Sequence, residues 1–582
     1  MSRTGRFLLH LGVAALIGLA AWLTFGRVGF VNYDSAWSLD WMRELLAGGA
    51  RPDLTVPFSP TPHPLSDLLS AALVPLSDAA GSSDRAGAAG ATGHGAEVAL
   101  VATAFLWIGV LGVVTFRLGQ AWFGTAAGVA AAFLLLTREP VLSYGLRTYL
   151  DLPYAAFLLL ALLAETRRPR NGVRTIAWIT LAGLLRPEAW LLAAAYVAYL
   201  VWWRVWGPDA AEGHPTDADP EDGLPTSDAP DPVRVPATEG PADARGIASA
   251  RPPAGGAPLP SRLRAAIVPL WPLVALALLA PLGWVIEGLI LSGDPLQALT
   301  GTQDNAEDLD RDTGLGAALT LTPRRLGEIV REPVLLAALL GAGMSLWWMR
   351  RRVLLPIGAL VAALGAFAAL GTVGLPLLTR YLVFPAALVV LLAAAGLLGW
   401  RRLPAGHTWR RRWQVGAAVC LLVLVAFAPA QADRLDRLQA ALALQNRVVD
   451  DLRTTVGDVV AAARADGRCT GVIALPNHRA IPQLTLWLGR PTDRERAADG
   501  PPRVTTIEIA QRERDASGAA LIDDAIVLLP TSERVARGFI LDKADSSRAL
   551  PESPAGGVDT GTVGVWRVIA TDAGCAERLR AR

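Results

Sequence analysis

Acidic and arginine residues that could do chemistry lie close to the ends of long apolar segments. The stretch GFVNYDSAWSLDWMRELLAGG, residues 29–49, follows an apolar run and places Asp34 within a few residues of it. The stretch TREPVLSYGLRTYLDLPYAAF, residues 137–157, places Arg147 and Asp151 just before another apolar run. Carboxylates can act as general bases, and arginines bind phosphate through paired hydrogen bonds. This pattern favours a reaction on a lipid-linked, anionic substrate at a membrane surface.

The elements that position these residues are predicted to be membrane-spanning helices. Of 582 residues, 52% are hydrophobic and 18% charged, and the mean hydropathy is +0.37, which is typical of a polytopic membrane protein. The net charge of +2 gives no field that would attract nucleic acid. A span needs about 20 apolar residues. We expect eleven spans, at 7–26, 97–116, 121–137, 150–165, 173–186, 188–204, 265–290, 333–349, 353–372, 382–400 and 414–430.

Basic residues predict the orientation, because cytoplasmic loops are enriched in them. Arginines cluster at one set of span ends, and the first span lacks a small-residue cleavage site, so we expect it to be retained. The amino terminus is then inside and the carboxyl terminus outside, in a multi-pass protein of the cytoplasmic (plasma) membrane. The segments expected outside are 27–96, 138–150, 186–188 and 291–332, joined by Arg380.

Two domains follow from the pattern. Residues 1–430 form the transmembrane part, and residues 431–582 are expected to form an extracytoplasmic α/β domain. That domain begins with a long amphipathic helix, and β-like runs recur at 471–475, 503–509, 525–529 and 563–569, with a helical segment at 478–489. Within the transmembrane part, residues 208–262 are rich in proline and acids and poor in aliphatics, so we expect a disordered cytoplasmic loop.

The cysteines suggest one disulfide. Cys420 lies in the last expected span, whereas Cys469 and Cys575 both lie in the α/β domain. An even pair in an oxidising compartment favours a disulfide. The alternative is two buried free thiols.

The acidic residues also have purely structural interpretations. Asp34 opens the helical pattern DSAWSLDWMRELL and would serve as a helix N-cap. Trp37, Trp41 and Leu45 recur at a spacing of four, which suits a helix lying along the membrane surface. Asp151 precedes Leu-Pro at the start of an expected span and would be a second cap.

Three further residues stand out in the outer segments. The alternating prolines of PTPHPLSDLL, residues 60–69, hold His63 on a stiff, extended backbone. Glu287 lies about two turns before Asp294, just inside an expected span, where an ionisable residue is a functional candidate. A metal site would need more ligands than the outer histidines supply. A divalent cation, Mg²⁺ or Mn²⁺, is possible, but no spacing requires one.

Several charged segments follow one another in an order that resembles a known family of membrane proteins. The residues are Tyr33-Asp34 followed by Arg43-Glu44, Asp151 in YLDLP, the hairpin LAGLLRPEAWLL (181–192) and the late segment LLTRYLVFP (377–385). The arrangement resembles the polyprenyl-phosphate-dependent glycosyltransferases of the GT-C fold, the superfamily of protein O-mannosyltransferases and lipid A aminoarabinose transferase. SPTPHPL (59–65) and SGDPL (292–296) are similar to segments of large actinobacterial membrane proteins of this class.

The resemblance implies a GT-C-like fold and a mechanism. The donor would be a sugar on polyprenyl phosphate, Asp34 the general base for an acceptor hydroxyl on a glycan or protein, and the reaction inverting. Asp151 would orient the acceptor or an arginine, or bind a divalent cation. Ser35 stands where several relatives have a second acid, which leaves the metal requirement open. The donor phosphate would be bound by Arg380, Arg186 and Arg147. The residues expected to orient the substrates are Tyr33, Arg43, Glu44, His63, Glu188, Glu287, Asp294 and Tyr381.

Two other functions remain open on the sequence alone. One is a membrane protein that binds lipid-linked glycans without catalysis, in which Asp34 is structural. The other is a transporter or flippase, although ionisable residues at mid-membrane and internal repeats, which many transporters have, are not evident.

Overall fold

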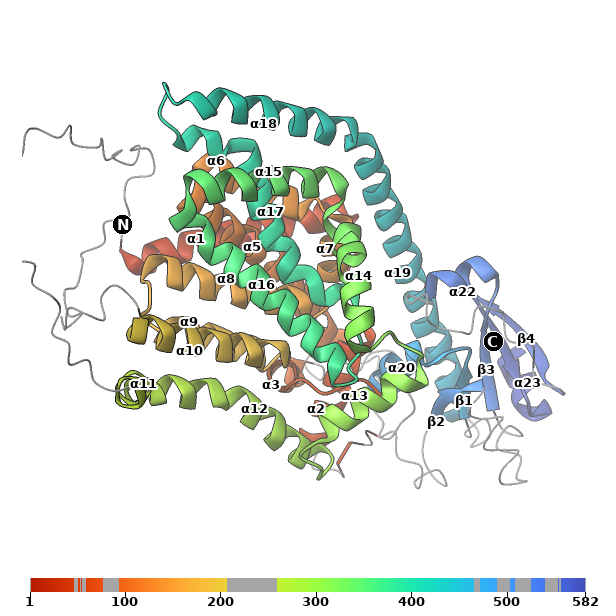
Figure 1. The fold of residues 1–582 in the computed structure, drawn as a ribbon. Helices are drawn as coiled ribbons and strands as arrows, with labels where there is room; N and C mark the ends of the chain where they lie inside the picture. The colour runs from red at the N-terminus through yellow and green to blue at the C-terminus, as the bar shows by residue number, and fades with distance from the viewer. Residues whose placement is uncertain are drawn as a thin grey trace, which may run out of the picture.

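The chain forms a helical bundle with a small α/β domain at one end, as the computed structural model shows (Figure 1). The structure describes residues 2–46, 51–52, 54, 59–76, 94–206, 259–464, 472–488, 503–507, 525–539, 553 and 556–580. The helices of the bundle are α1 (Arg3–Thr24), α5 (His94–Phe123), α6 (Thr125–Leu136), α8 (Asp151–Arg167), α9 (Val173–Gly183), α10 (Glu188–Trp206), α11 (Leu259–Ile267), α12 (Trp271–Leu291), α15 (Glu332–Trp348), α16 (Arg350–Thr372), α17 (Val383–Leu398) and α18 (Thr408–Ala426).

Shorter helices join the bundle to the α/β domain. They gather mainly at the end of the bundle that faces that domain (Figure 1). They are α2 (Tyr33–Leu46), α3 (Pro64–Leu73), α7 (Glu139–Leu146), α13 (Gln297–Asp308), α14 (Gly314–Val330) and the 3₁₀ turn η3 (Thr379–Leu382).

Membrane-spanning helices are confirmed, and their number is smaller than eleven by the criterion of length and hydropathy. Within the described residues, six helices are long and apolar enough to cross a bilayer, or up to nine if each bent pair is one span. Every expected span coincides with a helix, but α6, α8 and α9 are short, with 12, 17 and 11 residues. The count of eleven and the orientation stay predictions.

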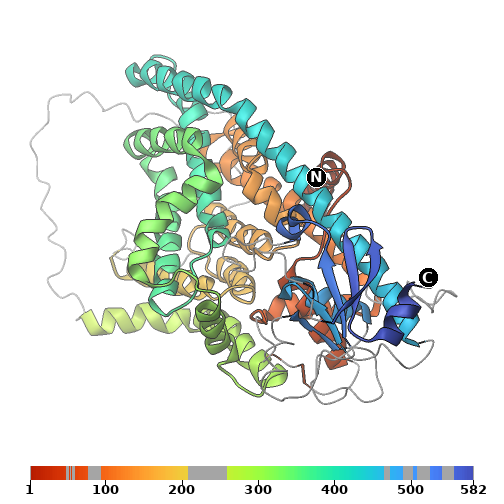
Figure 2. The ribbon, with the colours of Figure 1, turned by 90° about the vertical axis from the view of Figure 1, so that its right-hand side faces the viewer.

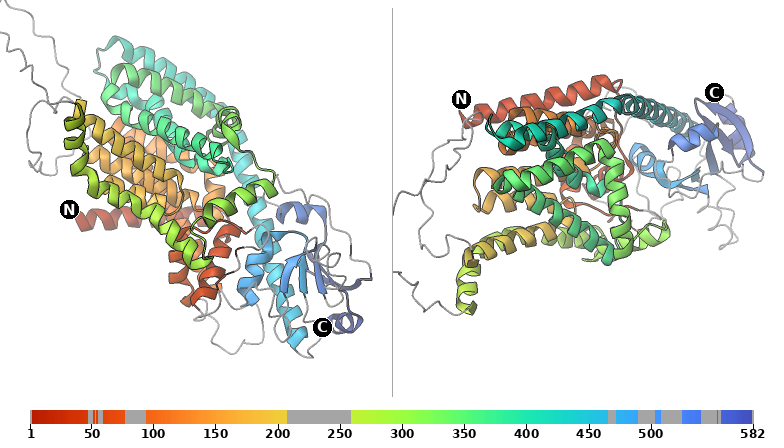
Figure 3. Two further views of the ribbon diagram at one scale, coloured as in Figure 1. Left: turned by 60° about the horizontal axis from the view of Figure 1, so that its bottom comes forward. Right: turned by 45° about the horizontal axis from the view of Figure 1, so that its top comes forward.

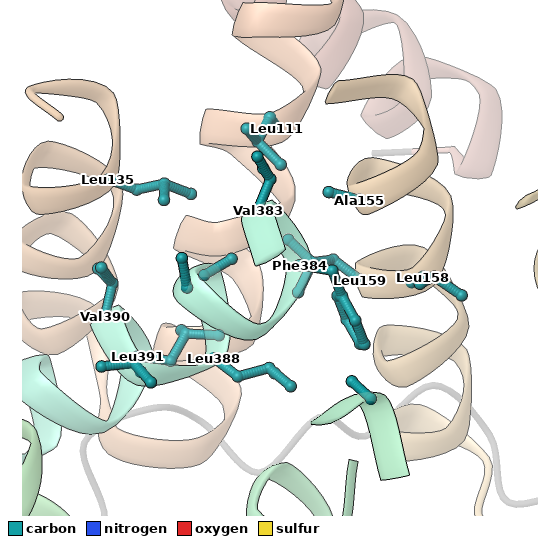
Figure 4. Close-up of a cluster of buried hydrophobic side chains, with 14 of the residues drawn as sticks. Leu111, Leu135, Ala155, Leu158, Leu159, Val383, Phe384, Leu388, Val390 and Leu391 are labelled. Atoms are coloured by element: carbon teal, nitrogen blue, oxygen red, sulfur yellow. The ribbon is translucent and has the colours of Figure 1, made fainter. Parts of the chain in front are cut away.

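Helix α17 forms the centre of the bundle because it is apolar on every face, as expected for a helix without a solvent side. Figure 4 shows Phe384 and Leu388 among side chains of neighbouring helices, including Leu159. Its contact with α15 is backbone to backbone: a Cβ on Gly396 would lie 2.0 Å from the Ala337 carbonyl oxygen. Small residues permit such close helix packing in membranes. The result is a rigid support for η3, which directly precedes α17.

The C-terminal domain is a five-stranded mixed sheet, which confirms the predicted α/β class. The strands are β1 (Val472–Leu475), β2 (Arg503–Thr506), β3 (Ala525–Pro530), β4 (Val558–Val563) and β5 (Trp566–Ala570), in the order β2-β1-β3-β5-β4. Strands β1, β2 and β3 pair in parallel, and β5 pairs antiparallel with β3 and β4. The sequence did not predict β4, because this edge strand is only half-buried and carries no apolar run.

The sheet packs against helix α19 (Ala428–Arg464). The domain also contains three shorter helices, α20 (Ile481–Leu488), α22 (Glu533–Phe539) and α23 (Ala573–Arg580). Figure 2 shows the sheet beside the last turns of this long helix. The Trp566 indole donates to the Val448 carbonyl at 2.9 Å, which ties β5 to α19. The long amphipathic helix expected from the sequence is therefore present and links the bundle to the sheet.

The apolar face of α2 differs from expectation. Trp37 and Trp41 are fully buried in a cluster that includes Leu484 and Trp487 of the C-terminal domain. The sequence predicted that this face lies on the membrane, but an amphipathic pattern specifies only that the face is covered. Here the apolar face is covered by the C-terminal domain, and α2 lies between the bundle and that domain.

Two predictions fall partly or wholly outside the described residues. Of the expected loop 208–262, only residues 259–262 are described, as the start of α11. Cys469 also lies outside, whereas Cys575 is disulfide-bonded and Cys420 is a free, buried cysteine. These states fit the expected disulfide.

Candidate active site

Asp34 lies at the start of α2 but does not cap that helix. The side-chain oxygen of Asn32 accepts a hydrogen bond from the Ser35 amide at 2.9 Å, so Asn32 satisfies the first turn. The loop before the helix is held in turn by Thr148, whose hydroxyl accepts from the Asn32 amide at 3.1 Å. The carboxylate of Asp34 is consequently available for other interactions.

Asp34 and Asp151 are brought together by Arg380. The Arg380 Nη1 lies 3.0 Å from Asp34 Oδ2, and its Nε lies 3.9 Å from Asp151 Oδ2. Asp151 occupies the first position of α8 and has only 2% of its side chain exposed, whereas Asp34 has 20%. Three elements far apart in sequence thus meet at one guanidinium.

The chain of alternating charges continues into the protein. Arg186 Nη1 lies 2.6 Å from Asp151 Oδ1, and Arg186 Nη2 lies 2.9 Å from Glu188 Oε1. The Arg186 guanidinium carbon is 3.4 Å from the ring centre of Tyr381, a stacked cation–π contact. This buried network fixes the position of Arg380 from behind.

The charges around Asp34 keep it ionised. Burial disfavours its charged form, but Arg380 and Arg311 outweigh that effect and hold the pKa of Asp34 below its usual value. Burial also lowers the pKa of His63 to about 3, so this imidazole is neutral near pH 7. The site therefore offers an anionic carboxylate beside a neutral imidazole.

These residues open onto a polar cavity of about 390 Å³. Its walls come from α2, the segment before α3, the α13–α14 connection, η3 and the C-terminal domain. The sequence-predicted residues that line it are Tyr33, Asp34, His63, Arg380 and Tyr381. Asp151, Arg186 and Glu188 stand directly behind this wall in the ion-pair network.

Two predicted arginines lie away from the cavity and from the ion-pair network behind it. Arg147, expected to bind donor phosphate, is buried and donates to Gln445 of α19 at 3.0 Å. Arg43 pairs with Asp40 at 2.5 Å and donates to the Leu486 carbonyl at 3.0 Å. Both arginines join the C-terminal domain and its helix to the bundle. Spacing alone could not separate this role from substrate contact.

Three predicted acidic residues also lie elsewhere. Glu44 belongs to α2 but is not part of the cavity wall. Asp294 accepts a hydrogen bond from the Leu296 amide at 2.9 Å and so closes a local turn. Glu287 hydrogen-bonds the buried Asp67, whose pKa is raised to about 6, chiefly by burial.

The cavity also contains charged residues that the sequence did not single out. Arg311 comes from the α13–α14 connection, Arg325 from α14, and His478 and Arg479 from the C-terminal domain. The His478 ring meets that of Tyr33 edge-on, with centres 5.2 Å apart. The charged run DLDRD, residues 308–312, was the available signal for Arg311, within the predicted outer loop 291–332.

The arrangement does not fit a divalent metal between the two aspartates. Arg380 occupies the space between the Asp34 and Asp151 carboxylates, so their charges are already compensated. Among the described residues, no group of three or more histidine, cysteine or acidic side chains is placed to hold a metal ion. We therefore derive no step through a metal.

Comparisons with known proteins show that the fold of this chain is similar to two solved structures. No protein-family model and no curated protein match the chain. It is similar to ArnT from Cupriavidus metallidurans bound to undecaprenyl phosphate, with 14% identity, a TM-score of 0.45 and 99% of each chain covered. It is also similar to the Archaeoglobus fulgidus oligosaccharyltransferase in complex with zinc and sulfate, with 14% identity, a TM-score of 0.40, and 75% of this chain and 55% of that chain covered. Similarity of this degree identifies neither substrate nor mechanism.

Proposed function

We propose that this protein is a membrane glycosyltransferase that moves a sugar from a polyprenyl-phosphate donor to an extracytoplasmic acceptor hydroxyl. The observation that carries the proposal is the pairing of an ionised Asp34 with Arg380 on the wall of a polar cavity at the end of apolar helices. A carboxylate that can accept a proton and a guanidinium that can bind phosphate are the two groups that such a transfer needs.

In the proposed reaction, Asp34 takes the proton from the acceptor hydroxyl while that oxygen attacks the anomeric carbon. The bond from this carbon to the phosphate oxygen breaks, and the polyprenyl phosphate leaves with the electron pair. Arg380 stabilises the negative charge that develops on the leaving phosphate. A single displacement inverts the anomeric carbon, and the proton on Asp34 returns to solvent.

The pairing with Arg380 also supplies a switch in basicity. While the guanidinium contacts only carboxylates, the low pKa of Asp34 makes it a weak base. When a donor phosphate shares Arg380, the carboxylate loses part of that attraction and its pKa rises. Asp34 thus becomes a better base when the donor is bound, and Asp151 and Arg186 hold Arg380 in reach of both groups.

The test is release of the lipid product. Purified protein in lipid nanodiscs is supplied with a panel of radiolabelled polyprenyl-phosphate sugars and a cell-envelope acceptor fraction. The proposal predicts that one donor loses its sugar to the acceptor and leaves polyprenyl phosphate. Donor binding without release would instead indicate a noncatalytic glycan-binding protein. Movement of intact donor across sealed vesicles without transfer would indicate a flippase.

A further inference from the structure

A second cavity, separate from the polar one, lies between α1, α5 and α19 and has a volume of about 680 Å³. The part of this cavity that lies along the apolar faces of α1 and α5 includes Leu19, Val98 and Phe105. Both views of Figure 3 place α1 at the edge of the bundle, and Leu19 and Val98 are about half exposed. The groove therefore opens to the side of the molecule that faces lipid.

Two close contacts set the floor of this groove. A Cβ on Gly109 would lie 1.8 Å from the Ala14 carbonyl oxygen, and one on Gly18 would lie 2.5 Å from the Phe105 carbonyl oxygen. The two backbones touch at these positions because small residues leave no side chain between them. Ala15, Gly18, Phe105 and Leu106 line the groove at these contacts, and the rest of its wall lies toward the C-terminal end of α1.

The upper end of the groove is polar. Arg27 is exposed there, and its guanidinium carbon lies 5.6 Å from the ring centre of Trp22. Within the part of the chain that the structure describes, Arg27 has no acidic partner. The other charges at this end are Asp450, whose carboxylate accepts from Asn446 at 3.1 Å, and the ion pair of Glu97 with Arg453. Arg27 is thus an available cation at the level where a span ends.

We propose that this groove binds a membrane phospholipid, with its phosphate on Arg27 and an acyl chain between α1 and α5. The order of the walls, apolar within the bilayer and cationic at its surface, matches the order of tail and phosphate in such a lipid. Arginine forms strong hydrogen bonds to phosphate, and tryptophan beside it suits the membrane interface.

The occupant is a phospholipid of the bilayer and not the sugar donor. The groove and the reaction cavity share no lining residue, so a phosphate on Arg27 is not in the wall that holds Asp34. The segment 27–31 forms one side of the groove and leads directly into α2. A lipid bound there would support the loop that places Asp34, and its presence does not depend on the proposed transferase activity.

The experiment is native mass spectrometry of the full-length protein, purified in detergent and titrated with phosphatidylglycerol. Arg27→Gln should weaken the tightest bound lipid about 10-fold, the effect of losing one charged hydrogen bond. Ala102→Trp, which fills the apolar part without changing charge, should weaken it similarly. Arg447→Gln is the matched control, because this arginine is exposed on the same stretch of α19 but does not line the groove.

Equal lipid affinity in the wild type, Arg27→Gln and Ala102→Trp would overturn the proposal. So would an equal loss in Arg447→Gln, since that would show a general effect of surface charge. Displacement of the phosphatidylglycerol from Arg27 by equimolar polyprenyl phosphate would also overturn it, because the groove would then belong to the donor lipid. The melting temperature of each variant checks that it is folded.

Discussion

Replacing Arg186 by glutamine should destabilise the protein strongly, because two buried carboxylates depend on this guanidinium. Arg186 contacts Asp151 at 2.6 Å and Glu188 at 2.9 Å, and no more than 7% of any of these side chains is exposed. Removing one member of a buried ion pair generally costs about 3–5 kcal/mol, since the remaining charge is left uncompensated.

The free-energy cost of leaving Asp151 without Arg186 should be at the lower end of that range, whereas the cost for Glu188 should be the full value. Asp151 keeps Arg380, whose Nε lies 3.9 Å away. Glu188 Oε2 has no hydrogen-bond partner among the described residues even in the wild type. The Arg186→Gln variant also removes the cation that pairs with Glu188 Oε1, so this buried carboxylate is left with an uncompensated charge. We therefore expect a loss of about 3–5 kcal/mol, on the order of 3–5 °C in melting temperature for a chain of this size.

The assay is thermal unfolding of the detergent-solubilised protein. Arg324→Gln is the matched control, because this arginine also pairs with a glutamate, at 3.2 Å, but its side chain is 76% exposed. Exposed pairs contribute about 0–1 kcal/mol, so the control should melt with the wild type. Adding Glu188→Gln to Arg186→Gln removes the uncompensated charge and should restore part of the loss. Equal melting of Arg186→Gln and Arg324→Gln would refute the buried-network reasoning, as would a double variant no more stable than the single one.

Three further changes test other parts of the account. Cys575→Ser should lower stability by about 2–4 kcal/mol, seen as a lower melting temperature that reductant reproduces in the wild type; insensitivity to reductant would exclude a structural disulfide. Because the folded pKa of His63 is about 3, below its usual 6.5, the unfolded chain binds the proton first. Stability should then fall as the pH drops from about 6.5 toward 3, and His63→Asn should flatten that melting profile; an unchanged profile would contradict this. Trp41→Ala empties a fully buried position between α2 and the sheet domain, so about 3–5 kcal/mol should be lost, with faster proteolytic release of the domain, and a protease-resistant variant would contradict the docking.

The helices could be predicted largely from the sequence, because long apolar runs admit one solution in a bilayer. The sheet was predictable where strands are buried, as in β3, and failed at the edge strand β4, whose exposed positions carry no pattern. The α13–α14 segment was predicted only as a loop, since helix α13 is polar nearly throughout. Elements without apolar periodicity, such as α13 and β4, were therefore not predicted.

The site was partly predictable for a different reason. Asp34, Asp151, Arg186 and Arg380 were chosen from their place at span ends and from the family resemblance, and the structure joins them in one network. Spacing did not show that Asn32 caps α2 in place of Asp34. The capping residue is decided by the geometry of a single turn, which residue type alone does not fix.

Residues contributed from distant parts of the chain were the hardest to predict. His478 and Arg479 reach the cavity only because α2 docks on the C-terminal domain through buried tryptophans. Arg147 has the residue type of a phosphate ligand, yet Gln445 of α19 takes up its side chain. Such assignments depend on tertiary contacts between segments roughly 300 positions or more apart.

The most direct test of the central claim compares sugar transfer by the wild type and Asp34→Asn in lipid nanodiscs, with the donor that the wild type uses. Asp436→Asn, which changes an exposed carboxylate on α19, is the matched control. If Asp34 is the general base, Asp34→Asn should retain donor binding and transfer the sugar about 10²–10⁴ times more slowly, with the control unchanged. Transfer by Asp34→Asn within a few-fold of the wild-type rate would contradict the account.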